Sequence, residues 1–209
     1  MNTELETNTA NHKISAKTRF SIVAVALVAF MGILAETSLN VTFPTLEKTF
    51  GLPLSTVQWV TTAYLLVVAI VMPTSSYISQ RFQNRTLFFS GLIFFTLGDL
   101  LSLISPNFTI LMAGRLIQGI GTGIAIPLMF NLVLTKIPRE RVGLWMGFAG
   151  MILSIAPALG PTYGGLLTGT LGWRKIFPSN MILPISLFPL GACAIEKSEK
   201  KRPGKFDFI

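Results

Sequence analysis

The sequence predicts an all-α, polytopic membrane protein built as a bundle of six transmembrane helices. Only 12% of its 209 residues are charged, whereas soluble domains average about 25%. Hydrophobic residues make up 51% and the mean hydropathy is +0.62. The few charges also leave long stretches free, including the 32 residues between Lys48 and Arg81. This composition excludes an ordinary soluble enzyme, a disordered chain and, with a single cysteine, a disulfide scaffold.

The charge-poor stretches are each long enough to cross the hydrocarbon core, which needs about 20 residues of helix. They lack the alternation of polar and apolar residues that a membrane-spanning strand requires. Residues 1–19 are polar and form a predicted cytoplasmic tail, and residues 196–209 form a basic cytoplasmic linker. The predicted bundle covers residues 20–195, with helices at 20–43, 55–80, 86–104, 108–135, 141–169 and 174–195.

Prolines and polar clusters separate these helices. Pro44 follows the first helix, and the segment 81–85, with two arginines, divides the second from the third. Residues 105–107 read Ser-Pro-Asn, which is a turn signal and predicts a tight hairpin between the third and fourth helices. The turn Ile137-Pro138-Arg139-Glu140-Arg141 ends the fourth helix, and Arg174 with Lys175 separates the fifth from the sixth.

The distribution of the 17 Lys and Arg residues predicts the orientation. Lys48, Arg174 and Lys175 fall on one side of the predicted membrane, and Arg115 falls within a helix. All the other basic residues fall on the opposite side, which by the positive-inside rule is cytoplasmic. We therefore expect a multi-pass protein of the cell membrane with both termini in the cytoplasm. The net charge of +8 is explained by topology, and we predict no nucleic-acid partner.

Three charged residues, Glu36, Asp99 and Arg115, lie inside the predicted helices. Charges in the bilayer core are costly and usually functional. With a rise of 1.5 Å per residue, all three fall near one level of the membrane. One interpretation is a proton-coupling group of all three residues, in which Glu36 carries the proton and Arg115 is its partner. The alternative for Glu36 and Arg115 is a static ion pair that joins the first and fourth helices. For Asp99 the alternative is local pairing only.

Polar residues share helix faces with these charges. Asn40 lies four residues after Glu36, and Gln118 and Thr122 lie three and seven residues after Arg115. Residues at these spacings occupy one side of a helix. We predict that they line a polar substrate cavity.

The fifth predicted helix is rich in small residues and prolines. Glycines spaced by four residues allow helices to approach closely, and prolines weaken the helical backbone and permit bending. The pattern therefore predicts either a tightly packed helix or a moving element. The residues concerned are Gly147, Gly150, Ala156, Pro157, Gly160, Pro161, Gly164 and Gly165.

Several of these motifs, in this order, resemble the N-terminal six-helix half of major facilitator superfamily transporters, and specifically the EmrB/QacA-type drug–proton antiporters. Position 36 is a glutamate where many relatives have an aspartate, and in this the sequence resembles the lincomycin-resistance (LmrB) branch. The resemblance covers residues ~20–209 and rests on the antiporter motif at 147–165, in which Ala156 replaces a glycine, the fourth-helix motif at 111–121, the first-helix motif at 34–44, and the runs at 59–65 and 173–177.

The resemblance adds two groups of residues. Tyr64, in the run 59–65, joins the predicted substrate cavity. Arg81 and Arg85 match the loop that latches the cytoplasmic gate in this family. Gln80 replaces the acid of that motif, and Ser76 and Gln83 replace glycines. The two arginines are therefore interpreted either as a weakened latch or as topological charge alone.

The resemblance implies proton-coupled efflux of small lipophilic or cationic drugs or antibiotics. The sequence contains no constellation typical of an enzyme or a metal site, so we expect no catalysis, no metal and no cofactor. The expected partners are the lipid bilayer, protons, a drug substrate, and a second transporter half or another copy of the chain. The resemblance also implies that the linker at 196–209 leads into a next helix that is missing from this chain. The alternative is therefore a truncated, transport-inactive membrane fragment or an interaction partner.

Overall fold

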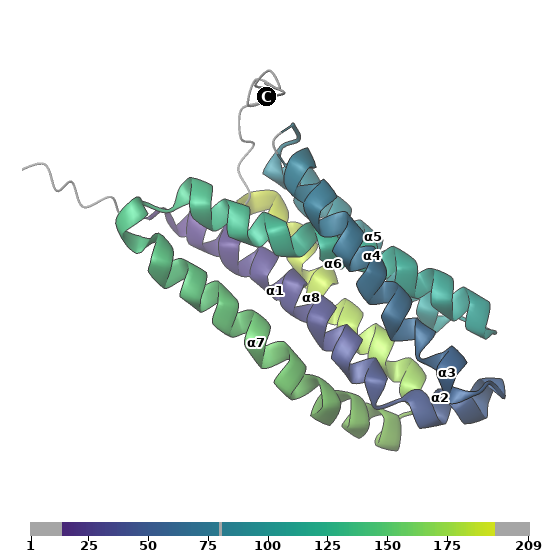
Figure 1. The fold of residues 1–209 in the computed structure, drawn as a ribbon. Helices are drawn as coiled ribbons and strands as arrows, with labels where there is room; N and C mark the ends of the chain where they lie inside the picture. The colour runs from purple at the N-terminus through teal and green to yellow at the C-terminus, as the bar shows by residue number, and fades with distance from the viewer. Residues whose placement is uncertain (1–13, 80, 195–209) are drawn as a thin grey trace, which may run out of the picture.

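A computed structural model of the chain describes residues 14–79 and 81–194, and the description below concerns those residues. They form an all-helical bundle without strands (Figure 1). The predicted fold class, with a long helix over each of the six predicted spans, is confirmed. The elements are α1 (Ala16–Asn40), α2 (Phe43–Phe50), α3 (Leu54–Val57), α4 (Trp59–Ile78), α5 (Asn84–Leu103), α6 (Phe108–Lys136), α7 (Arg139–Thr170), a 3-10 turn (Trp173–Lys175) and α8 (Ile176–Ala194).

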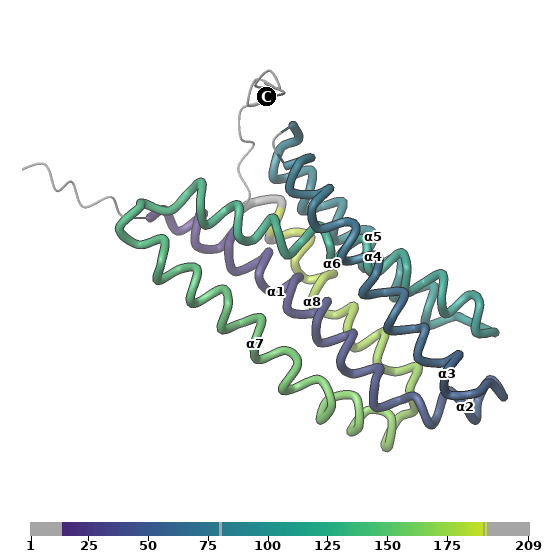
Figure 2. The backbone as a smooth tube through the Cα atoms, viewed as in Figure 1, coloured from purple at the N-terminus to yellow at the C-terminus, as the bar shows by residue number. Residues whose placement is uncertain are grey.

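Helices α1 and α6 lie at the centre of the bundle. Helix α6 contacts α4, α5 and α1, while α1 also contacts α7 and α8. Helix α7 runs along one edge of the bundle beside α1 (Figure 2). The first residues of α1 and the last of α8 lie at the same end of the bundle (Figure 1), as an even number of crossings requires.

The first predicted helix was too long at its C-terminal end. Helix α1 ends at Asn40, and a separate short helix, α2, follows from Phe43 to Phe50. Pro44 lies in the first turn of α2, where its missing N–H leaves no helical hydrogen bond unmade. Gly51 ends α2 with a φ of 63°, a left-handed conformation that glycine adopts without steric cost. Pro44 therefore begins a new helix rather than simply ending the old one.

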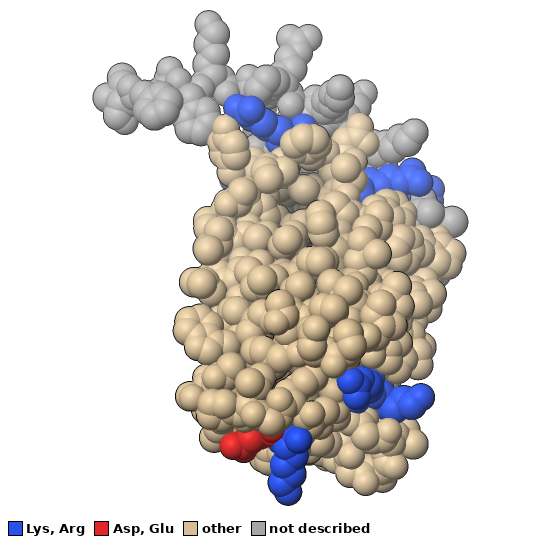
Figure 3. Space-filling model, turned by 90° about the vertical axis from the view of Figure 1, so that its right-hand side faces the viewer, with Lys and Arg blue, Asp and Glu red and all other residues tan. Residues whose placement is uncertain are grey.

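The outer surface of the bundle is apolar. Leu144, Leu166 and Ile182 are each at least 66% exposed. In the view of Figure 3, basic side chains gather towards the two ends and a broad uncharged surface separates them. Five described helices are long and apolar enough to cross a membrane, counting Leu54–Ile78 as one. The chain is a multi-pass membrane protein.

An aromatic cluster closes the end of the bundle where α2 lies. The Trp173 ring meets Phe50 edge-on at 5.8 Å and Phe177 at 6.0 Å. The Arg174 guanidinium lies over the Trp173 ring and donates a hydrogen bond to the Ser105 carbonyl at 2.9 Å. These contacts hold the α5–α6 turn, α2 and the start of α8 together.

Most of the two predicted terminal segments lies outside the described residues. Of the tail predicted at 1–19, the structure describes residues 14–19, and α1 already begins at Ala16. The predicted linker at 196–209 is wholly outside the described part.

Candidate functional site

A network of polar side chains crosses the middle of the bundle and joins α1, α4, α5 and α6. Its centre is Arg115 of α6, whose side chain is fully buried. Asp99 of α5 and Gln118 of α6 are equally inaccessible. Because buried charges are costly unless they are paired and hydrogen-bonded, the contacts of these three residues decide what the site can do.

The Gln118 amide bridges the two buried charges. Its Oε1 accepts a hydrogen bond from Arg115 Nη1, and its Nε2 donates to Asp99 Oδ1 at 2.7 Å. The carboxylate and the guanidinium are thus connected through one neutral side chain. Asp99 Oδ2 and Arg115 Nε and Nη2 have no hydrogen-bond partner among the described residues.

Tyr64 of α4 covers the other side of the arginine. Arg115 Cζ lies 4.1 Å from the centre of the Tyr64 ring, a distance at which a cation and an aromatic face attract. The Tyr64 hydroxyl lies 2.8 Å from the Gly32 carbonyl of α1 and 2.8 Å from Thr122 Oγ1 of α6. Tyr64 therefore links three helices around the guanidinium.

Glu36 belongs to a second, more accessible part of the network. Gly32, Glu36 and Asn40 occupy one face of α1 at four-residue intervals. The Asn40 amide donates to Glu36 Oε1 at 3.4 Å and accepts from Thr61 Oγ1 of α4 at 2.9 Å. Glu36 is half-buried and Asn40 is exposed. This arm reaches from the buried Tyr64 contact towards the surface.

Glycines bring the helices close enough for the network to form. A Cβ atom at Gly98 would lie 2.6 Å from the Gly114 carbonyl oxygen and 2.6 Å from Gln118 Cβ. A Cβ atom at Gly114 would lie 2.8 Å from the Gly98 carbonyl oxygen. These positions admit only glycine at the present helix separation, and that separation allows Gln118 to reach Asp99.

The structure places the predicted site residues in two environments. The three predicted proton-coupling residues lie in this network, but no ion pair joins Glu36 to Arg115 among the described residues. Of the predicted cavity residues, Asn40 is exposed, whereas Tyr64, Gln118 and Thr122 are at most 1% exposed and lie between helices. Thr61 was missed, although it lies in the 59–65 run that contributed Tyr64.

The small residues of α7 divide between two faces. Ala156, Gly160 and Gly164 are buried, and Gly160 and Gly164 pack directly on Thr37 and Ser38 of α1. On the other face, Pro157 and Pro161 are exposed. A Cβ atom at Gly147 or Gly150 would meet nothing within 4 Å, and one at Gly165 only Val41 Cγ1 at 3.8 Å. One face of the helix is therefore packed through small residues and the other is open.

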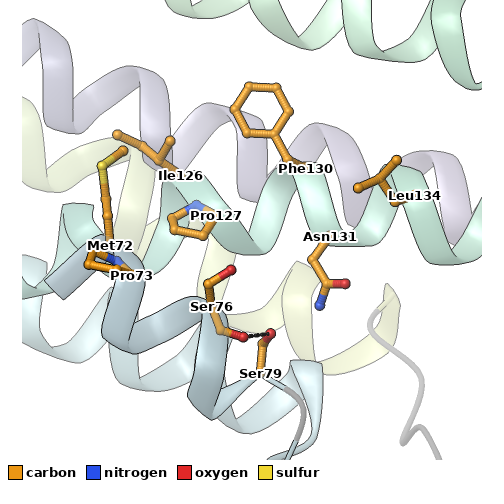
Figure 4. Close-up of a pocket in the computed structure, with 9 residues that line it drawn as sticks. All are labelled: Met72, Pro73, Ser76, Ser79, Ile126, Pro127, Phe130, Asn131 and Leu134. Atoms are coloured by element: carbon orange, nitrogen blue, oxygen red, sulfur yellow. Dashed lines mark hydrogen bonds between the residues drawn. The ribbon is translucent and has the colours of Figure 1, made fainter. Parts of the chain in front are cut away.

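The predicted gate loop lies between α4 and α5. Arg81 is exposed and its guanidinium lies 5.1 Å from the centre of the Tyr77 ring. Arg85, at the start of α5, lies 5.8 Å from the Phe89 ring centre. Near the C-terminal end of α4, a pocket of about 460 Å³ lies between α4 and α6. Figure 4 shows Pro73 and Ser76 of α4 facing Pro127 and Asn131 of α6 across it.

Comparisons with known proteins agree with this architecture. Residues 25–207 match the profile of the Major Facilitator Superfamily. The chain is 36% identical over 188 residues to the lincomycin resistance protein LmrB of Bacillus subtilis, covering 90% of this chain and 39% of that protein. It is 32% identical to a multidrug resistance protein B homolog of Mycobacterium tuberculosis, covering 88% of this chain and 34% of that protein. The chain thus spans less than two-fifths of the length of these curated relatives.

A solved structure has a similar fold. The crystal structure of a D-xylose-proton symporter superimposes with a TM-score of 0.72 at 18% sequence identity, over 87% of this chain and 49% of that chain. At this identity the likeness concerns the fold alone. The six long helices correspond to one half of such a transporter.

Proposed function

Because the chain belongs to the major facilitator superfamily, whose members are transporters rather than enzymes, we propose that it is part of a proton-coupled carrier that exports drugs or antibiotics. The observation that carries this proposal is the buried Arg115, with two carboxyl groups, Asp99 and Glu36, on neighbouring helices of one network. Such groups within a membrane span are typical of ion and proton pathways. Relatives named for lincomycin and multidrug resistance support the class of substrate.

Glu36 is the proposed proton carrier. It is half-buried and hydrogen-bonded to the exposed Asn40, so a proton can reach it without crossing the packed core. An apolar setting favours the neutral form of a carboxyl group, whereas a nearby positive charge favours the ionised form. A carboxylate that holds either a proton or a cationic drug, but not both, couples the movement of one to the other.

The proposed setting is the cell membrane, with both termini in the cytoplasm. The clustering of Lys and Arg at one end supports this orientation. In this orientation Arg81 and Arg85, in the α4–α5 connection, face the cytoplasm and serve as a weakened latch. The open face of α7, with Pro157 and Pro161, meets a second transporter half or another copy of the chain.

The chain covers only part of the length of its relatives, and this favours a second candidate function. At 39% and 34% of their length, the 209 residues correspond to part of a transporter. The alternative is therefore a membrane-embedded fragment that does not transport by itself and acts, if at all, as an interaction partner.

Dye export from vesicles tests both candidates. The 209-residue chain is reconstituted and assayed for export driven by a proton gradient. Export that is abolished by Glu36→Gln and retained by Glu47→Gln, on the short helix α2, supports the carrier and the role of Glu36. Normal export by Glu36→Gln would exclude Glu36 as the proton carrier. No export by the unaltered chain favours the inactive fragment.

A further inference from the structure

We propose that the resting counter-ion of Arg115 is Asp99, reached through the Gln118 amide, and that Gln118 is the positioning residue that holds the two charges in this relation. The electrostatic balance of the arginine then does not depend on Glu36. This inference concerns the folded state of the chain; its consequence for proton coupling rests on the proposed function.

The first argument is the burial of the three side chains. Asp99, Gln118 and Arg115 are all 0% exposed. A single charge in this position would be strongly unfavourable, whereas a positive and a negative charge together leave the buried group neutral. Among the described residues, the carboxyl group that is fully buried is that of Asp99. Two successive hydrogen bonds, through Gln118, join it to Arg115.

The second argument is that the geometry of the bridge is set by the backbone. Arg115 and Gln118 are three residues apart on α6 and therefore lie on the same face. Asp99 directly follows Gly98, which packs against the backbone of Gly114 and Gln118. The close approach of α5 and α6 thus positions the carboxylate at the length of one glutamine side chain. A shorter or apolar side chain at 118 cannot connect both charges.

The third argument is the position of Glu36. The Tyr64 ring of α4 lies over the Arg115 guanidinium, and Asp99 of α5 is joined to it through Gln118. No hydrogen bond or ion pair among the described residues joins Arg115 to Glu36 of α1. Tyr163 of α7 is occupied by a hydrogen bond to Asn180 of α8. The Glu36 carboxyl group accepts a hydrogen bond from Asn40. On this assignment, gain or loss of the Glu36 proton breaks none of the hydrogen bonds of the Asp99–Gln118–Arg115 bridge.

A double-mutant cycle on thermal unfolding tests the assignment. The 209-residue chain is purified in detergent as Asp99→Asn, Arg115→Gln and the double variant. Removing one member of a buried ion pair leaves the other charge uncompensated, so each single variant should lower the unfolding midpoint by about 10 °C. Because the double variant leaves no buried charge, it should recover at least half of this loss. Effects of the two changes that simply add would overturn the proposal.

Three matched variants make the test specific. The cycle of Glu36→Gln with Arg115→Gln should be additive, and a recovery there equal to that with Asp99→Asn would assign the counter-ion to Glu36 instead. Gln118→Met keeps the side-chain length but removes the amide, and should abolish most of the coupling between Asp99 and Arg115. Undiminished coupling would refute the role of Gln118. Thr96→Val, at a buried hydroxyl without a hydrogen-bond partner, should leave the midpoint unchanged.

The test remains decisive if a single variant does not fold. If Arg115→Gln gives no folded protein, recovery of folded protein on adding Asp99→Asn supports the pairing, and no recovery refutes it. Export is not measured in these experiments. A failure of the counter-ion assignment is therefore distinguishable from a failure of the proposed transport function, which the vesicle assay reports.

Discussion

Replacing Gly164 by alanine should separate α7 from α1 and destabilise the bundle. An alanine Cβ at this position would lie 2.8 Å from Ser38 Cα and 2.9 Å from the Ser38 carbonyl carbon. Carbon atoms in contact are normally about 3.5–4.0 Å apart. The two helix backbones would therefore have to move apart by roughly 1 Å, because the clash involves the backbone rather than a side chain that can rotate away.

The size of the effect follows from two opposing terms. Overpacking of this kind costs about 1–3 kcal/mol, whereas alanine is better than glycine in a helix by about 1 kcal/mol. Because the clash is with the Ser38 backbone, the overpacking cost falls in the upper part of its range, at about 2–3 kcal/mol. The net loss is then ~1–2 kcal/mol, which corresponds to a fall of roughly 2–8 °C in the unfolding midpoint for a domain of this size.

The neighbouring glycine supplies the control. A Cβ at Gly165 would meet only Val41 Cγ1, at 3.8 Å. Gly165→Ala should therefore benefit from the higher helix propensity of alanine, and the unfolding midpoint should stay equal or rise. The two variants differ by one position in the same helix and are compared by thermal unfolding in detergent, followed by circular dichroism. Equal midpoints for Gly164→Ala and Gly165→Ala would refute the close packing of α7 on α1.

Two further predictions concern the centre and the end of the bundle. Tyr64→Phe removes the hydroxyl that contacts Gly32 and Thr122 but keeps the ring over Arg115, so it should cost about 1–2 kcal/mol in a denaturation experiment; a loss as large as that of Tyr64→Leu would contradict a role for the ring. Trp173→Ala should cost about 3–5 kcal/mol because Trp173 is buried. The control Trp59→Ala, at a side chain 55% exposed, should cost much less, and equal losses would argue against the aromatic cluster.

Hydropathy and charge spacing predicted the six long helices because each crossing is determined locally, by a run of apolar residues between charges. The turn at 105–107 was predictable from its own Ser-Pro-Asn sequence. In the structure, Asn107 caps α6 by accepting a hydrogen bond from the Ile110 N–H at 2.9 Å. Helix α2 was not predicted. Pro44 is compatible with both the end and the start of a helix, and only the folded chain, with Leu46 buried in the aromatic end of the bundle, selects between them.

The sequence by itself determined that three charges, Glu36, Asp99 and Arg115, lie inside membrane helices, since composition alone makes each of them exceptional. Which charges are neighbours was decided only by the tertiary structure. Depth along a helix follows from residue number, but the direction in which a side chain faces a neighbouring helix depends on how the helices pack. Here the glycine contacts between α5 and α6 bring Asp99 to Gln118, and Arg115 is joined to Asp99 rather than directly to Glu36.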